Sequence, residues 1–258
     1  MIIKKIKKLK SKVVITFVDS SKFEVDNSVF PNFYLYEGKD VSKKELSEIK
    51  SYNNVAKLTQ YALKIRSKSL YSEFKMREKL YAKGATKGEV DKVIKMLKHY
   101  DLIDDNALAE DLLEYYNSMN YGENKIKEKL KDKGIFEERI AKIKFPVSIE
   151  KKKAKNIFPS LEKKYDKYND TQKKQHIYNA YLNAGFSGEI AKEMVDTLKP
   201  SNPKEENDKL KKDFDKVYIR LARKYQKKDL RNKVIQALLA KGYKMNDILK
   251  IVEKKLWN

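Results

Sequence analysis

The strongest constraint on the fold is a glycine that recurs four times at the same place in an apolar pattern. Successive copies lie 50, 51 and 57 residues apart, at Gly84, Gly134, Gly185 and Gly242. The residues eight and four positions before each glycine are Met76 and Leu80, Ile126 and Leu130, Ile177 and Tyr181, and Val234 and Leu238. Positions four residues apart share one face of an α-helix, and glycine readily takes the left-handed conformation that ends a helix. We therefore expect each glycine to end an amphipathic helix within an internal repeat.

Apolar residues on both sides of this helix complete a unit of three helices. The residue after each glycine and the next apolar residue are Ala85 and Val90, Ile135 and Ile140, Phe186 and Ile190, and Tyr243 and Ile248. The residue directly after the glycine is expected to pack against the end of the helix, and the later apolar residue is expected to begin the buried face of the next helix. A further helix is expected before each unit, at residues 58–66, 107–116, 154–165 and 214–225. The predicted fold class is mainly α, with tandem three-helix repeats that form an elongated curved molecule and stabilise one another by stacking.

The predicted boundaries follow the repeat. We expect an N-terminal extension with strands and a short helix at 1–53, and repeats at 54–103, 104–146, 147–200 and 201–258. Pro146, Pro200 and Pro203 fall between repeats, where a helix must break. The stretch 199–209 is the best candidate for a flexible linker.

The first 40 residues differ from the rest because they alternate in the manner of strands. Val13, Ile15 and Phe17 form a β-branched and aromatic run, and a second half-buried strand is expected around residues 23–25. Ile3 and Ile6 predict a third strand before Ser11. The alternative is an amphipathic membrane helix that carries Ile2, Ile3, Ile6, Leu9 and Val13. Ser42 with Glu45 resembles a capping box, which predicts a short helix from residue 43 to about 52.

The charge favours a polyanionic partner. The chain of 258 residues carries a formal net charge of +22, and nucleic acid is the first candidate for such a surface. Lysine outnumbers arginine by 53 to 6, so the codon bias of an A+T-rich genome is an alternative source of the charge. The absence of cysteine excludes disulfides and thiolate metal sites, and no apolar run reaches 18 residues. We expect a cytoplasmic protein that does not enter a membrane.

No constellation of residues predicts catalysis. Asp104 and Asp105 are adjacent, and helix capping explains them better than acid–base chemistry. His99 and His176 lie far apart and have no neighbouring ligand residues, and no phosphate-binding Gly-x-x-x-x-Gly-Lys loop is present. The prediction is therefore a protein that is not an enzyme and uses no cofactor and no metal.

Basic residues recur at helical spacing and predict a binding surface. Lysines stand nine, five and one positions before both Gly84 and Gly134, and i, i+4, i+8 positions form a stripe on a helix. The candidate basic track consists of Lys75, Arg77, Lys79, Lys83, Lys125, Lys129, Lys133, Arg220, Arg223, Lys233 and Lys241. An ordinary solvated lysine face, neutralised by nearby glutamates, is the alternative. Tyr115, Tyr116 and Tyr121 are better explained as packing residues than as a platform for bases.

Several of these segments together resemble the RecX family. The resemblance is most specific in the second repeat, where Leu102-Ile103-Asp104-Asp105 and Ala109 are followed by Tyr121-Gly122, Ile126, Leu130 and Lys133-Gly134-Ile135. The segments 72–80 and 238–248 and the N-terminal strands are also similar to that family, so nearly the whole chain is covered. Lys75 departs from the family, which tends to have Glu there, and the third repeat matches weakly.

The resemblance implies a function that composition and spacing do not. RecX proteins are tandem three-helix repeats that bind the RecA recombinase filament along its groove, inhibit its ATPase and strand-exchange activities, and also contact DNA. It implies a monomeric regulatory protein in DNA repair, recombination and the SOS response, with the RecA filament and single- and double-stranded DNA as partners. The alternative is a helical-repeat module that binds DNA or RNA without RecA.

Overall fold

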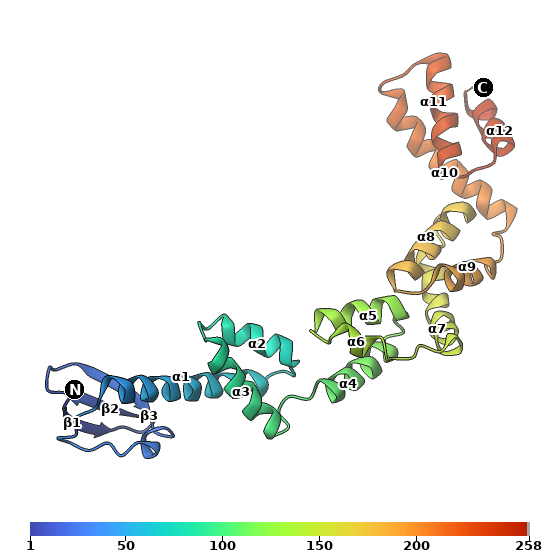
Figure 1. Ribbon diagram of the computed structural model, residues 1–258. Helices are drawn as coiled ribbons and strands as arrows, with labels where there is room; N and C mark the ends of the chain where they lie inside the picture. Colours follow the sequence, from blue (N-terminus) through green and yellow to red (C-terminus); the bar gives the residue numbers. More distant parts are fainter. Residues whose placement is uncertain (257–258) are drawn as a thin grey trace. The chain divides into compact units, whose positions relative to one another are not determined.

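The computed structural model describes residues 1–256, and within them the chain is mainly helical with one small antiparallel sheet (Figure 1). This confirms the prediction of a mainly α fold with strands in the N-terminal extension. The contacts divide the chain into two compact units. One unit comprises Met1–Leu112 and Leu130–Ile140, and the other comprises Leu113–Lys129 and the described residues from Ala141 onward.

The N-terminal sheet has the strand order β1-β2-β3, with β1 at Ile3–Lys8, β2 at Lys12–Phe17 and β3 at Lys22–Asp26. Val13, Ile15 and Phe17 are buried on one face, as the alternating pattern predicts. Residues 2–9 do not form an amphipathic membrane helix, because β1 pairs with β2 along most of its length.

Helix α1, Lys43–Arg66, is longer than the sequence predicts. The prediction of a short helix ending near Tyr52 and a second one starting at Leu58 is wrong, because no glycine or proline interrupts the segment. Asn53, within this helix, is buried and bonds β3, accepting from the Asp26 amide at 2.8 Å and donating to the Glu24 carbonyl at 2.8 Å. One end of α1 therefore lies against the sheet and the other against α2, Glu73–Tyr81, and α3, Lys87–His99 (Figure 1).

The remaining helices continue in groups of three. They are α4 Asp105–Ser118, α5 Glu123–Asp132, α6 Glu137–Ile140, α7 Val147–Tyr165, α8 Asp170–Asn183, α9 Gly188–Asp196, α10 Pro203–Ala222, α11 Lys227–Ala240 and α12 Met245–Leu256. A short 3-10 helix, η1 at Phe30–Asn32, follows the sheet. The boundary between the two compact units falls inside α4 and α5.

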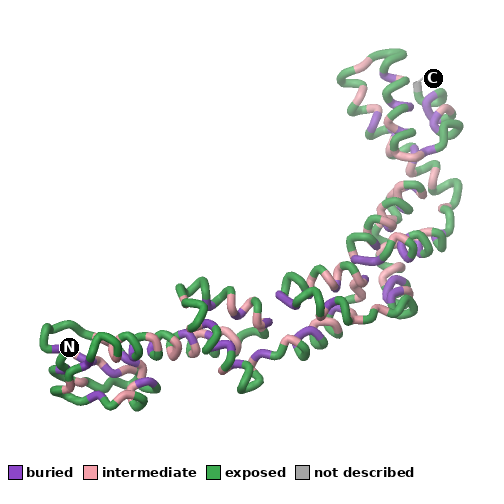
Figure 2. The backbone as a smooth tube through the Cα atoms, in the orientation of Figure 1, coloured by how far each residue is buried: buried purple, intermediate pink, exposed green. Residues whose placement is uncertain are grey.

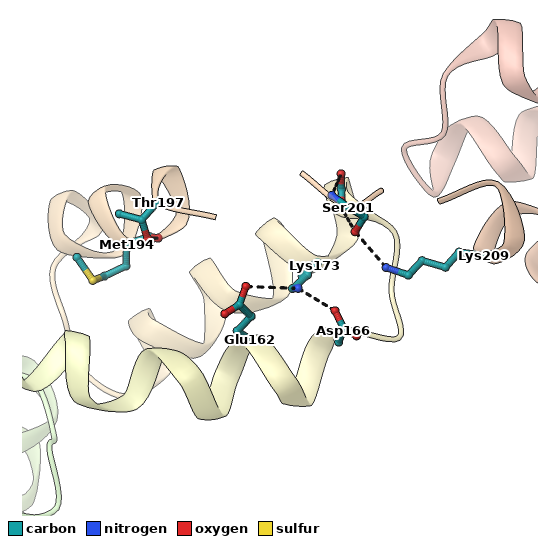
Figure 3. A network of polar contacts seen from close by, with 8 residues as sticks. Glu162, Asp166, Lys173, Met194, Thr197, Ser201 and Lys209 are labelled. Carbon is teal, nitrogen blue, oxygen red and sulfur yellow. Dashed lines mark hydrogen bonds and ion pairs between the residues drawn. The ribbon is translucent and has the colours of Figure 1, made fainter. Parts of the chain in front are cut away.

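Residues 199–209 are not a flexible linker through their whole length. Helix α10 begins at Pro203, which lies at the first helical position, and the side chain of Asn202 accepts from the Lys204 amide at 2.9 Å. Lys209 donates to the hydroxyl of Ser201 at 3.3 Å, as Figure 3 shows. The prediction failed because proline and asparagine start a helix here rather than interrupt one.

Each of the four glycines lies just beyond a helix and has a positive φ, between 79° and 92°. The amide of the residue after each glycine donates to the carbonyl five residues earlier: Ala85 to Leu80, Ile135 to Leu130, Phe186 to Tyr181, and Tyr243 to Leu238. This is the 6→1 hydrogen bond of a Schellman cap. The apolar residues four and eight positions before the glycines are fully buried.

Burial is distributed along the chain rather than gathered in one core (Figure 2). One apolar cluster lies between the sheet and the start of α1. Further apolar clusters lie within the groups α1–α3, α7–α9 and α10–α12. Each of these clusters lies within one compact unit. Among the described residues, no helix combines the length and apolar character needed to cross a membrane.

Candidate binding surface

The basic residues of α2 are divided between ion pairs and solvent. Lys75 donates to Glu78 at 2.8 Å, and Arg77 bonds both Glu73 at 2.9 Å and Asp91 at 2.6 Å. The hydrogen bond to Asp91, followed by the one to Glu73, raises the pKa of Arg77 above its ordinary value. Arg77 therefore links α2 to α3.

Further along α2, Lys79 is exposed, and Lys83, just beyond the helix, lies over the ring of Tyr61, 4.9 Å from its centroid. Within residues 1–256 neither side chain forms an ion pair with a carboxylate. Among the four track residues of the first repeat, these two lysines are the ones that a partner could reach without displacing a carboxylate.

Helix α5 repeats this arrangement. Lys125 donates to Glu128 at 2.8 Å, which lowers the pKa of that carboxyl group. Lys129 lies over Tyr116 and Tyr121, 5.6 Å and 5.4 Å from the ring centroids, and Lys133 is exposed. The glutamates do neutralise part of the lysine face, as the alternative interpretation of the track expects, but they leave the lysines five and one positions before the glycine free of carboxylates.

The fourth three-helix group carries the last candidates. Arg220 and Arg223 are exposed near the end of α10. Lys233 lies 6.0 Å from the ring of Tyr225, whereas Lys241 pairs with Asp213 at 2.8 Å. The side chain of Lys241 therefore ties α10 to the end of α11.

The residues weighed for catalysis have structural contacts. Asp104 accepts from the amides of Asn106 and Ala107 at the start of α4, and Asp105 accepts from the Glu73 amide at 2.8 Å. His99 contacts Tyr100, and His176 stacks on Tyr165 with ring centroids 5.2 Å apart. No group of three or more potential metal ligands occurs in the described part of the chain.

A set of contacts that the sequence did not predict joins neighbouring three-helix groups. We call each set a joint: the start of the second helix of one group meets the helix-ending glycine of the next. The Ser72 hydroxyl donates to the Lys133 carbonyl at 2.6 Å, the Gly122 amide to the Ala184 carbonyl at 2.8 Å, and the Asn169 side chain to the Lys241 carbonyl at 2.9 Å. In each case the acceptor is the residue directly before a helix-ending glycine.

A carboxylate from the next group completes each joint. Asp105 accepts from the Glu73 amide at 2.8 Å, Glu150 from the Glu123 amide at 2.9 Å, and Glu206 from the Asp170 amide at 3.2 Å. A negative charge at the first turn of a helix is favourable because the first amides lack intrahelical partners. The donor residues, directly after the cap of α2, α5 and α8, are themselves acidic.

Buried polar groups lie beside these joints. Lys153 forms an ion pair with Glu150 and donates to the Tyr121 carbonyl at 2.7 Å, and both charged side chains are about 5% exposed. Figure 3 shows Lys173 between Asp166, at 2.9 Å, and Glu162, at 3.8 Å. Burial raises the pKa of Glu206. The joints thus combine backbone hydrogen bonds with partly desolvated charges.

These features define a tandem helical-repeat protein whose second helices carry basic side chains. No family model matches the chain. Curated relatives named Regulatory protein RecX match nearly all of it: the protein from Lactococcus lactis subsp. cremoris (strain SK11) is 28% identical over 95% of this chain and 94% of its own length. The one from Streptococcus sanguinis (strain SK36) is 27% identical over 99% of this chain and 100% of its own length.

Solved structures agree with the sequence comparison. A crystal structure of regulatory protein RecX superposes with a TM-score of 0.59 at 25% identity, covering 75% of this chain and 98% of that one. RecX from Lactobacillus salivarius shares the fold, with a TM-score of 0.51 at 22% identity over 56% of this chain and 96% of that one. The resemblance to the RecX family is therefore confirmed.

Proposed function

We propose that this chain binds the RecA–DNA filament and modulates, mainly by inhibition, its recombinase and ATPase activities. The observation that carries the proposal is the similarity along nearly the whole chain to proteins named Regulatory protein RecX. The proposal assigns no chemical step to the chain. It assigns binding to exposed side chains that recur from one three-helix group to the next.

The recurring lysines support this mode of binding. Lys79 and Lys129 stand five positions before the helix-ending glycines of the first two groups, and Lys83 and Lys133 stand one position before them. A partner that is itself a repeating polymer can engage such groups in series, and linked weak contacts then add to a much higher avidity. The net charge of +22 would also attract phosphate and acidic protein surfaces, and would speed encounter at low salt.

The candidate residues differ in whether a carboxylate already holds them. Those that are already held by carboxylates would have to exchange a partner in order to bind; these are Lys75, Arg77, Lys125 and Lys241. The others are available without that exchange, namely Lys79, Lys83, Lys129, Lys133, Arg220, Arg223 and Lys233. We propose that the second set carries most of the binding.

A titration of filament ATPase activity tests the function. RecA is assembled on single-stranded DNA, and ATP hydrolysis is measured as the chain is added. We expect hydrolysis to fall at well below one chain per RecA monomer, because one chain would contact several subunits. An unchanged rate at equimolar protein contradicts the proposal.

A pair of charge-matched variants tests the surface. The double variant K79E/K133E reverses two exposed lysines of the track, whereas K87E/K95E reverses two exposed lysines on α3. Both change the net charge equally. We expect the first to raise the concentration for half-inhibition by about tenfold and the second by much less. Equal effects would show that net charge, rather than the track, determines binding.

The charge also supports the second candidate, a nucleic-acid-binding module that acts without RecA. If about six phosphates are neutralised, the logarithm of affinity for DNA should fall with that of salt with a slope of roughly −4 to −5. Tight, sequence-selective binding to DNA in the absence of RecA would favour this candidate over the filament regulator.

A further inference from the structure

Three of the four helix-ending glycines are covered by the preceding three-helix group, and one is open. A Cβ atom on Gly134 would lie 2.6 Å from the Ser72 hydroxyl, one on Gly185 2.3 Å from the Lys125 amide nitrogen, and one on Gly242 2.5 Å from Thr171. Within the described part of the chain, a Cβ atom on Gly84 would meet no atom within 4 Å. The surface that the other groups use to join their neighbours is therefore vacant in the first group.

A cavity lies at this vacant surface. Its volume is about 330 Å³, and its lining includes Asn54, Lys57, Tyr61, Lys83, Gly84 and Glu89. Gly84 and the carbonyl of Lys83 correspond, by the repeat, to Gly134 and the carbonyl that accepts from Ser72. We call this cavity the Gly84 seat.

The occupied joints show what a seat of this kind holds. In all three, the start of a helix lies against the glycine: a small polar or glycine cap bonds the carbonyl before the glycine, and the next residue is acidic. The caps are Ser72, Gly122 and Asn169, and the acidic residues are Glu73, Glu123 and Asp170. The structure thus contains three examples of the fit between a helix start and this surface.

The Gly84 seat differs from the occupied joints in charge. Where the other groups supply the carboxylate of Asp105, Glu150 or Glu206, α1 supplies the neutral Asn54 and the cationic Lys57. Lys83 adds a second cation at the rim, and the carboxylate of Glu89 is already held by the Thr86 amide at 2.8 Å. An incoming helix with an acidic first turn is therefore better matched here than a basic one.

We propose that the Gly84 seat is a docking site for the start of a helix from a partner protein, with a small polar cap followed by an acidic residue. This goes beyond the proposed function, because it concerns one cavity in the first three-helix group and a specific element of a protein partner. A second copy of this chain is a poorer occupant. Its net charge of +22 opposes association, and α11, the second helix of the fourth group, begins with Lys227 and Lys228 rather than with an acidic residue.

A peptide probe tests the proposal on the full chain. The probe begins Ser-Glu-Phe-Lys, as residues 72–75 do, continues as an alanine–glutamine helix and carries a fluorophore at its far end. Binding is followed by anisotropy, and the site is located by amide shifts in the NMR spectrum. We expect saturable binding, with the largest shifts at residues 54–61 and 83–89. No binding at millimolar peptide, or shifts centred elsewhere, would overturn the proposal.

Matched variants separate the seat from the rest of the surface. N54W fills the cavity from an exposed position on α1, and L63W places the same ring at a 40% exposed position on that helix outside the cavity. We expect N54W to weaken peptide binding at least tenfold and L63W to leave it unchanged. A probe with lysine in place of the glutamate should bind about tenfold more weakly than the original. Equal effects of the two variants, or equal binding of the two probes, would contradict the proposal.

Analytical sedimentation tests whether a second copy of this chain, rather than a partner protein, occupies the Gly84 seat. We expect the chain to sediment as one species over the concentration range of the peptide titration. Self-association that N54W abolishes would make a second copy the occupant and would overturn the proposal of a partner helix.

Discussion

Replacing Gly185 by alanine should destabilise the chain much more than replacing Gly84 by alanine. Both glycines have left-handed backbones, with φ of +92° and +79°. They differ in surroundings, because a Cβ atom at Gly185 would lie 2.3 Å from the backbone nitrogen of Lys125, whereas one at Gly84 meets nothing within 4 Å. The pair therefore separates the cost of the conformation from the cost of opening a joint.

The magnitudes follow from these contacts. The left-handed conformation costs a non-glycine residue about 1 to 2 kcal/mol, and both variants incur it. At Gly185 the clash is with backbone, so the joint must open and lose two hydrogen bonds, from the Gly122 amide to the Ala184 carbonyl at 2.8 Å and from the Asn124 amide to the Gly185 carbonyl at 3.0 Å. At about 1 kcal/mol each, these bring the total for G185A to roughly 3 to 4 kcal/mol.

Urea unfolding followed by circular dichroism measures both variants against the wild type. The expected difference between them is about 2 kcal/mol, from the two hydrogen bonds. Hydrogen exchange should also rise at residues 122–126 in G185A and remain unchanged there in G84A. If the two variants lose the same stability, the joints contribute nothing beyond backbone conformation, and the reasoning is refuted.

Three further predictions test other parts of the structure. E150Q removes the charged partner of the buried Lys153 and should cost roughly 3 kcal/mol in thermal or urea unfolding; a loss below 1 kcal/mol would show that solvent reaches the pair. N202A should cost about 1 kcal/mol and speed hydrogen exchange at the start of α10, whereas unchanged exchange there would mean that Asn202 does not cap the helix. Burial raises the pKa of Tyr181 to about 12, above the ordinary value of about 10 for a tyrosine, so its contribution to stability is complete below pH 10 and is lost as the pH rises through 12. Burial also raises the pKa of Tyr243, so absorbance at 295 nm during an alkaline titration should show a late phase whose amplitude Y181F lowers by one tyrosine. An unchanged amplitude of that phase in Y181F would contradict the prediction.

The repeat could be predicted from the sequence because each of its signals is local. A glycine, an apolar residue four positions earlier and another eight positions earlier all belong to one helix and its cap. Asp101 and Asn120 also have positive φ, at 52° and 55°, after α3 and α4, but these residue types end helices less consistently than glycine and gave no periodic signal.

The joints could not be predicted because their partners are distant in the chain. Ser72 and Lys133 lie 61 residues apart, and Asn169 and Lys241 lie 72 apart. Ser and Asn are residue types that favour the start of a helix, but which carbonyl Ser72 and Asn169 each reach depends on how the groups pack. The ion pairs of the basic track could not be predicted for the same reason. Arg77 on α2 pairs with Asp91 on α3, and the sequence alone does not say which faces of these two helices meet.

Binding to the filament rather than to its DNA alone is the central claim, and co-sedimentation measures it directly. The chain is mixed at one salt concentration with RecA assembled on single-stranded DNA, or with the same DNA bare, and the bound fraction is measured over a range of chain concentrations. The account predicts half-saturation of the filament at a concentration at least tenfold lower than that of bare DNA. Equal affinity for the two, or tighter binding to bare DNA, would contradict it.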